Sequence, residues 1–367
     1  MLNIAFIEDD EASVKPVLNM ILREEPDVNI QTFDFDAAAQ GIRSFRPDIV
    51  ILDLWEGEIA ESSNRGSEHL DFIWNQQFCP VIIHSANPDI PPEQTNAFVI
   101  EVTKGQNSPL HVLTAIREFK PHVQALKDAE DDIRDSYSIA MRDVAPSTFD
   151  VITDVDQRNE ALRRAGRRRL AALMDESSIS GQLLASWEQY LYPPVSNHLL
   201  LGDVLRQAGS NWRDPESFRI VLTPSCDLVS TGERGAKVSN VLVAKCFGIR
   251  AGISLTSWKD MSPAKLKDRL IRTVLSRGYF ESIVPFPALQ GRIPTMVAHL
   301  RDLDTIPLDD IGQREEPFLR VASLDSPFRE LVSWAHVIVS GRPGIPERDL
   351  QSWRDQIVVA YEEAESK

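Results

Sequence analysis

The stretch Pro47-Asp48-Ile49-Val50-Ile51-Leu52-Asp53-Leu54 decides the fold of the first part of this chain. Its aliphatic run follows a turn-forming proline and predicts a strand that is buried on both faces, as strands of a parallel α/β sheet are. Asp53 then stands at the carboxyl end of the strand, the edge where ligands bind in such sheets. A carboxylate placed there needs a counter-charge such as a metal ion, so we interpret Asp53 as a functional residue.

A second acidic strand end lies upstream. The apolar run 2–7 leads directly into Glu8-Asp9-Asp10-Glu11. Because the carboxyl ends of parallel strands meet at one edge, the two runs bring a carboxylate cluster together. Acidic residues that close a single strand often only face water. Two such strand ends, joined by a hydroxyl and a lysine from later strands, favour a functional site.

Two further apolar runs supply the hydroxyl and the lysine. Residues 80–86 read Pro-Val-Ile-Ile-His-Ser-Ala and contain Ser85, and residues 98–104 read Phe-Val-Ile-Glu-Val-Thr-Lys and end at Lys104. In this order, the four strand ends resemble the receiver domain of two-component response regulators over about residues 1–120. The resemblance implies a doubly wound, flavodoxin-like parallel sheet of five strands.

The resemblance also implies roles for the residues at the strand ends. Glu8 and Asp9 correspond to the acidic pair that binds Mg²⁺ together with the acceptor aspartate, Asp53. Ser85 and Lys104 correspond to the residues that contact the phosphoryl group. This chemistry is physically consistent, because Mg²⁺ takes oxygen ligands and offsets the mutual repulsion of clustered carboxylates. The expected partner is a histidine kinase or a phosphotransfer protein of a phosphorelay.

The chain departs from the receiver pattern in several places. Gly105 follows Lys104 where receivers usually have a proline, and Glu101 stands where they carry an aromatic switch residue. Residues 87–96 include three prolines, which are incompatible with a regular helix interior. We therefore expect the fourth helix to be absent or reduced to one turn. The acidic loop 55–66 is a candidate gate over the acceptor.

Composition bounds the class of protein. The 367 residues exceed the usual size of one hydrophobic core, and no apolar run reaches the ~20 residues of a membrane span. Three cysteines without metal-ligand spacing predict a cytoplasmic protein without disulfides. Residues 1–145 hold 26 Asp and Glu against 11 Lys and Arg, whereas the remainder holds 29 against 28. We expect no nucleic-acid partner for so acidic a first half and no membrane association.

The helix that follows Lys104 continues beyond a receiver domain. Residues 108–145 predict one long linker helix that opens with a favourable Ser-Pro start. Its apolar positions from Val112 to Val144 follow a four-three alternation typical of a coiled-coil seam, interrupted by Glu130. Two interpretations remain open. The helix makes a homodimer through 112–144, or it packs on the C-terminal domain of its own chain.

Residues 146–367 predict an output domain of mixed α/β type that starts after the Pro146 break. We expect it to be helical over 150–192, strand-rich over 199–250 and mixed over 260–367. The strand-rich part faintly resembles the small SH3-like β-barrels of PemK- and MazF-type toxins, which does not assign an activity. The five arginines within Arg163–Arg169 could bind nucleic acid, dock the acidic receiver or form a solvated face. Of these we favour intramolecular docking.

The resulting hypothesis is a response regulator switched by phosphorylation of Asp53. Its own chemistry is expected to stop at taking a phosphoryl group from a donor and losing it by autodephosphorylation. One alternative is a receiver-controlled hydrolase or nuclease that uses Cys226 with His198 or His299 as its base, although a free cysteine is more often inert and buried. Another is a scaffold that never accepts phosphate.

Overall fold

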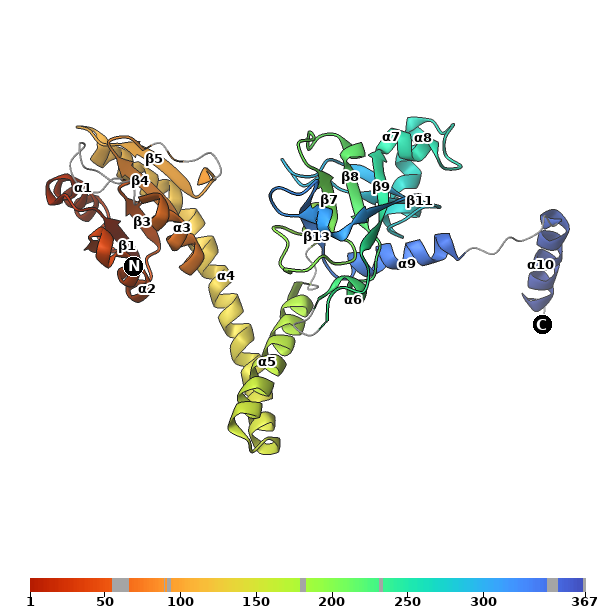
Figure 1. The fold of residues 1–367 in the computed structure, drawn as a ribbon, viewed down its shortest axis with the longest axis horizontal. Helices are drawn as coiled ribbons and strands as arrows, with labels where there is room; N and C mark the ends of the chain where they lie inside the picture. The colour runs from red at the N-terminus through yellow and green to blue at the C-terminus, as the bar shows by residue number, and fades with distance from the viewer. Residues whose placement is uncertain are drawn as a thin grey trace. The chain divides into compact units, whose positions relative to one another are not determined.

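The computed structural model describes residues 1–54, 66–88, 90, 94–178, 183–230, 234–341 and 349–365. The chain divides into two compact units, Met1–Gln182 and Leu183–Lys367 (Figure 1). Within the described ranges, no helix is both long enough and apolar enough to cross a membrane.

The first unit contains a five-stranded parallel sheet with the order β2-β1-β3-β4-β5 (Figure 1). Its strands and helices are β1 (Leu2–Ile7), α1 (Glu11–Glu24), β2 (Val28–Phe33), α2 (Phe35–Phe45), β3 (Ile49–Leu52), α3 (Gly66–Gln76), β4 (Val81–Ser85), β5 (Val99–Thr103), α4 (Ser108–Val151) and α5 (Val155–Ser178). This strand order with helices on both faces is the flavodoxin-like receiver fold, which confirms the predicted fold of this part.

Helices cover both faces of this sheet. Phe6 and Ile51 pack on one face against α1 and the first half of α4. Ile7 and Val50 pack on the other face against α2 and α3. All four residues of β3 are fully buried. Burial on two sides explains why the strands read as unbroken aliphatic runs rather than as alternating sequences.

The described part of the segment between β4 and β5 does not form the usual helix. None of the residues described there, 86–88, 90 and 94–98, lies in an α-helix. Gln94 Nε2 donates to Asp71 Oδ1 of α3 at 2.8 Å, and Ile90 is buried in the core on that face. The predicted loss of the fourth helix is confirmed for these residues. The acidic loop 55–66, the candidate gate, lies outside the described residues except for Gly66, where α3 begins.

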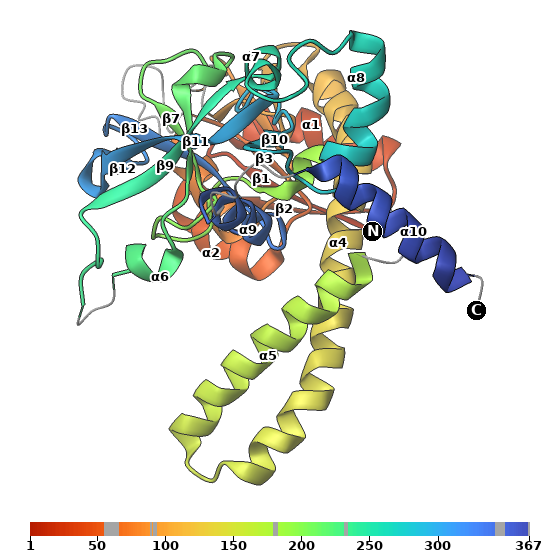
Figure 2. The ribbon, with the colours of Figure 1, turned by 90° about the vertical axis from the view of Figure 1, so that its right-hand side faces the viewer.

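Helix α4 is longer than predicted. It spans 44 residues and continues through Pro146 to Val151, so the predicted end at 145 and the domain boundary at 146 are wrong. Helix α5 runs antiparallel to the C-terminal half of α4 and lies beside it, as Figure 2 shows. Gly166 of α5 permits this close approach, because a Cβ there would lie 2.9 Å from Met141 Cε. Packing between the two helices outweighs the cost of proline inside α4.

Most of the predicted coiled-coil seam is used inside the chain. Val112, Ile116, Phe119 and Val123 lie in the receiver core, and Ala140 is buried in the half of α4 that packs with α5. The distal part of the seam therefore packs within its own chain, as the second interpretation expected. The element that it packs against is α5 and not the C-terminal domain. Ile133 and Tyr137 keep 46% and 52% of their surface exposed and are the seam residues left for a partner.

The second unit is built on a mixed, mainly antiparallel sheet with the order β10-β11-β9-β8-β7-β13-β12, and β6 pairs with β13. Its elements are β6 (Tyr190–Leu191), β7 (Val204–Gln207), β8 (Phe218–Val221), α6 (Ser225–Leu228), β9 (Asn240–Gly248), α7 (Ile249–Ser254), α8 (Pro263–Arg269), a π-helical turn (Leu270–Leu275), β10 (Ile283–Phe286), β11 (Met296–Pro307), β12 (Ile311–Gly312), β13 (Phe318–Leu324), α9 (Phe328–Ser340) and α10 (Leu350–Glu365). Among the described strands no pairing closes this path into a ring, so the SH3-like barrel stays a prediction.

The predicted helical range 150–192 is wrong in its last part. Helix α5 ends at Ser178, and the described residues from 183 onward form only a 3₁₀ turn, Ser186–Gln189, before β6. Leu183, Leu184 and Trp187 are 99%, 57% and 50% exposed, so these apolar residues do not form the buried face of a helix. Tyr190 instead pairs with Leu324 of β13.

A buried ion pair anchors the turn before β7. Asp203 Oδ2 lies 2.7 Å from Arg320 Nε and accepts from the backbone N–H of Leu200 at 2.7 Å. Ser323 Oγ donates to Asp203 Oδ1 at 2.6 Å. The turn Gly202-Asp203-Val204 therefore has a structural role, because the Asp203 carboxylate is fully buried and bonded within the unit.

Candidate functional site

Strands β1, β3 and β5 bring predicted site residues to one edge of the receiver sheet, with β4 between β3 and β5. Glu8 follows β1, Asp53 follows β3 and Lys104 follows β5. The parallel register pairs Ile7 with Leu52, so the next residues, Glu8 and Asp53, leave their strands at the same level. The backbone N–H of Lys104 donates to the carbonyl oxygen of Ser85 at 2.9 Å, which holds the end of β5 to the end of β4.

Lys104 lies between the two buried carboxylates. Its Nζ is 2.5 Å from Glu8 Oε2 and 2.8 Å from Asp53 Oδ2. Glu8 and Asp53 are only 4% and 5% exposed, whereas Asp9 is exposed at the rim. Oxygen atoms of all three carboxylates lie within 4.8 Å of one another. A hard divalent cation fits this donor set, since three oxygens converge from two strand ends beside open solvent.

The electrostatics of the site show an excess of negative charge. Burial raises the pKa of Glu8 to about 7, with a further contribution from Asp53, although the contact with Lys104 opposes the shift. Burial alone would lower the pKa of Lys104, but its bonds to Asp53 and Glu8 outweigh that effect and raise it. One lysine therefore does not fully compensate the two buried carboxylates, and a second cation would find a favourable position here.

Asp10 has a different role from its acidic neighbours. It is the N-cap of α1, where its side chain accepts from the backbone N–H of Ala12 at 2.9 Å and from Ser13 Oγ at 2.6 Å. These bonds lower the pKa of Asp10. The Asp10 N–H in turn donates to Glu8 Oε1 at 3.2 Å. Capping of α1 thus orients Glu8 toward the site.

Asp53 and Ser85 differ in how their oxygens are used. Asp53 Oδ1 accepts from the backbone N–H of Leu54 at 2.7 Å, while Oδ2 contacts Lys104. Ser85 is fully buried at the end of β4, and its Oγ has no hydrogen-bond partner among the described residues. A buried hydroxyl is costly to leave unpaired, so the Ser85 hydroxyl keeps an unused hydrogen-bonding capacity among the described residues.

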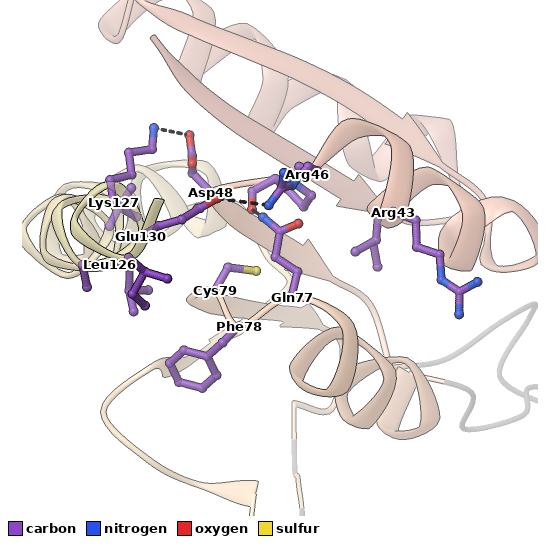
Figure 3. Close-up of a pocket in the computed structure, with 14 residues that line it drawn as sticks. Arg43, Arg46, Asp48, Gln77, Phe78, Cys79, Leu126, Lys127 and Glu130 are labelled. Atoms are coloured by element: carbon purple, nitrogen blue, oxygen red, sulfur yellow. Dashed lines mark hydrogen bonds and ion pairs between the residues drawn. The ribbon is translucent and has the colours of Figure 1, made fainter. Parts of the chain in front are cut away.

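A hollow of about 560 Å³ lies where α4 passes Pro47, at the start of the opening sequence stretch (Figure 3). Lys127 Nζ is 2.8 Å from Asp48 Oδ2, and Arg46 Nη2 is 3.1 Å from Glu130 Oε1. Glu130, which interrupts the heptad pattern, is therefore paired within the first unit. Asp48, unlike Asp53, fastens the linker helix to the sheet.

The Cys226 alternative does not gain a base from the structure. Cys226 is exposed, and its Sγ lies 3.6 Å from Asp227 Oδ1. His299 Nε2 is instead bonded to Ser282 Oγ at 2.9 Å, and no contact joins His198 to Cys226 within the described part of the chain. Among the described residues, neither histidine is hydrogen-bonded to the predicted nucleophile.

The arginine cluster of α5 contacts its own helical hairpin. Arg169 Nη2 lies 3.2 Å from Asp143 Oδ2 of α4, and Arg164 Nη1 lies 3.4 Å from Glu160 Oε1 of α5. These pairs are exposed and contribute little to stability. They support an intramolecular role for part of the cluster, with the linker helix rather than the receiver domain as its partner.

Comparison with known proteins finds similar solved structures for the N-terminal part. The receiver domain of a LuxO-type repressor protein from Vibrio parahaemolyticus is 19% identical and covers 35% of this chain and 97% of its own, with a TM-score of 0.29. The response regulator domain of CheB from Thermotoga maritima is 21% identical and covers 32% and 95%, with a TM-score of 0.26.

A third similar structure is the response regulator PhyR from Brucella abortus, which is 20% identical and covers 35% of this chain and 51% of its own, with a TM-score of 0.29. No protein-family model matches the sequence, and no curated protein matches it. Each of these three similarities covers only about the N-terminal third of this chain.

Proposed function

We propose that this protein is a response regulator in which Asp53 accepts a phosphoryl group. One observation carries the proposal: Lys104 Nζ bridges Glu8 and Asp53 at the strand edge, where the buried Ser85 hydroxyl has no hydrogen-bond partner among the described residues. A nucleophilic carboxylate, a cation and a free donor at one edge are the groups that phosphoryl transfer requires.

In the proposed reaction, a carboxylate oxygen of Asp53 attacks the phosphorus of a phosphohistidine or a small acyl phosphate. The bond from phosphorus to the donor breaks, and the donor leaves with its electron pair. Lys104 and Ser85 then hold two oxygens of the transferred group through charge-assisted hydrogen bonds. Mg²⁺ held by Glu8, Asp9 and Asp53 would neutralise charge on the transferring oxygens. Water later attacks the phosphorus, the bond from phosphorus to the Asp53 oxygen breaks, and inorganic phosphate leaves while Asp53 regains its carboxylate.

The partner of this reaction would be a histidine kinase or a phosphotransfer protein, and the second unit would carry the output. A phosphoryl group adds about −1.5 to −2 charges at the edge and three strong acceptors, which is enough to shift a two-state segment. The output activity itself is not assigned by the geometry of the second unit.

Incubation with acetyl phosphate and Mg²⁺ tests the proposal. Intact mass spectrometry should show one added phosphoryl group per chain, and the addition should disappear when EDTA removes the metal. Wild-type protein that gains no mass under conditions where a known receiver is modified would instead favour the scaffold that never accepts phosphate.

We further propose that the protein forms a homodimer through the exposed part of the 112–144 seam. Ile133 and Tyr137 lie one helical turn apart on α4 and are both about half exposed. Lysine at both positions would place charge in the contact and should convert a dimer into folded monomers, as measured by light scattering. Lysine at the exposed position Arg142 serves as the matched control, because it keeps the charge. A wild-type monomer at micromolar concentration would refute the dimer.

A further inference from the structure

Adjacent residues at the end of β4 face opposite sides of the receiver sheet. Successive side chains of a strand alternate, so His84 points away from the side that Ser85 faces. The His84 ring lies edge-on to Phe6 with ring centroids 6.1 Å apart, in the layer between the sheet and helices α1 and α4. A shift of the β4 backbone that draws Ser85 toward a bound oxygen would also move the adjacent His84.

His84 is bonded to the first residue of α4. Its Nε2 lies 3.0 Å from Ser108 Oγ, and both residues are buried. Nδ1 has no partner among the described residues, so Ser108 supplies the single hydrogen bond that the structure gives this ring. Burial, assisted by the charge of Lys104, lowers the pKa of His84 to about 4, so the ring is neutral at physiological pH.

This bond takes the place of an ordinary helix cap. Asn107, the N-cap residue of α4, makes no side-chain cap hydrogen bond. Only residues 105–107 separate Lys104 from Ser108, and Ser108 N–H donates to the carbonyl oxygen of Gly105 at 3.0 Å. A cavity of about 260 Å³ lined by His84, Lys104, Ser108 and their neighbours leaves room for this turn to rearrange.

We infer that His84 is a positioning residue that couples the acceptor edge to helix α4 through its hydrogen bond with Ser108. The inference rests on the proposed function, because the signal it carries is the phosphoryl group on Asp53. Glu101, in the place of the aromatic switch, is exposed on β5, so a read-out through a buried aromatic is missing at that position. The bond from β4 to α4 supplies an alternative that leads directly into the 44-residue helix.

Hydrogen exchange of the full-length protein tests the inference. Peptides from residues 108–119 are followed with and without acetyl phosphate and Mg²⁺, and intact mass reports the adduct in the same samples. In wild type, phosphorylation should change exchange at the start of α4 about fivefold, the factor that corresponds to one ordinary hydrogen bond. Ser108→Ala and His84→Leu should reduce the change to less than about twofold while the adduct level stays the same.

Ser108→Thr is the matched control, since it keeps the hydroxyl and should retain the wild-type response. Ser108→Ala removes one oxygen from a helix terminus and guards against a folding defect in His84→Leu. A full adduct with an unchanged exchange response in Ser108→Ala would overturn the inference alone. If wild type forms the adduct but hydrogen exchange at 108–119 does not change, the inference is likewise overturned and the proposed function stands. A wild type that forms no adduct would overturn the proposed function, and the inference with it.

Discussion

Asp53→Asn is expected to abolish the phosphoryl adduct that acetyl phosphate and Mg²⁺ form on the wild-type protein. The amide is nearly isosteric, and its oxygen can still accept from the Leu54 N–H, but it is a far weaker nucleophile than a carboxylate. Lys104 keeps its contact with Glu8, so the fold of the edge should persist. Intact mass spectrometry should show no added mass, against one phosphoryl group on wild type.

Asp48→Asn is the matched control for this variant. Asp48 immediately precedes β3, at the opposite end from Asp53, and bonds Lys127 and the backbone N–H of Asn3 instead of Lys104. The control should form the adduct at the wild-type level. An Asp53→Asn protein that still gains the full mass would place the acceptor elsewhere and remove the basis of the proposed function.

Glu8→Gln is expected to stabilise the metal-free protein at pH 8 and to remove most of the stabilisation by Mg²⁺. The pKa of Glu8 is raised from 4.5 to about 7 in the folded chain. Between these values the folded protein binds more protons at Glu8 than the unfolded chain does, so stability falls as pH rises from about 4.5 through about 7. Each pKa unit corresponds to ~1.4 kcal/mol, which puts the gain on the order of 2 kcal/mol after the lost contact with Lys104 is discounted.

Calorimetry at pH 5.5 and pH 8, with and without Mg²⁺, measures both effects. Wild type should lose stability with rising pH in the absence of metal, and Mg²⁺ should restore it most strongly at pH 8, where Glu8 is deprotonated. Glu101→Gln, at an exposed position of β5, is the matched control and should behave as wild type. An equal Mg²⁺ response in Glu8→Gln and wild type would place the ion away from Glu8.

Local sequence predicted the receiver sheet well. Aliphatic runs such as Ile49–Leu52 can be satisfied only by burial on two faces, and a residue that directly follows such a run lies at the carboxyl edge. The meeting of Glu8, Asp53 and Lys104 at that edge was therefore predictable. Prolines such as Pro88 likewise predicted that the residues described between β4 and β5 form no α-helix, because a proline removes a backbone donor whatever its surroundings.

The long helix shows where such local reasoning ends. Its heptad pattern predicted a buried stripe but could not say what covers it, since the receiver core, a second helix and a second copy all satisfy the same periodicity. In the tertiary structure, Phe119 packs in the receiver core, Glu130 forms an ion pair with Arg46, and Met141 lies against Gly166 of α5. The proline at 146 suggested an end, but packing with α5 keeps the helix intact.

The sequence by itself determined four strands of the first unit and the chemical groups at their carboxyl ends, because these follow from residue type and spacing along one segment. The five-stranded sheet was implied by the resemblance to receiver domains. Only the tertiary structure decided that Lys104 bridges two carboxylates, that Ser85 Oγ finds no partner within the described ranges and that His84 bonds Ser108. Each of these depends on distances between segments that are far apart in the chain. Those distances are set by the packing of whole helices and strands, which residue patterns within one segment do not specify.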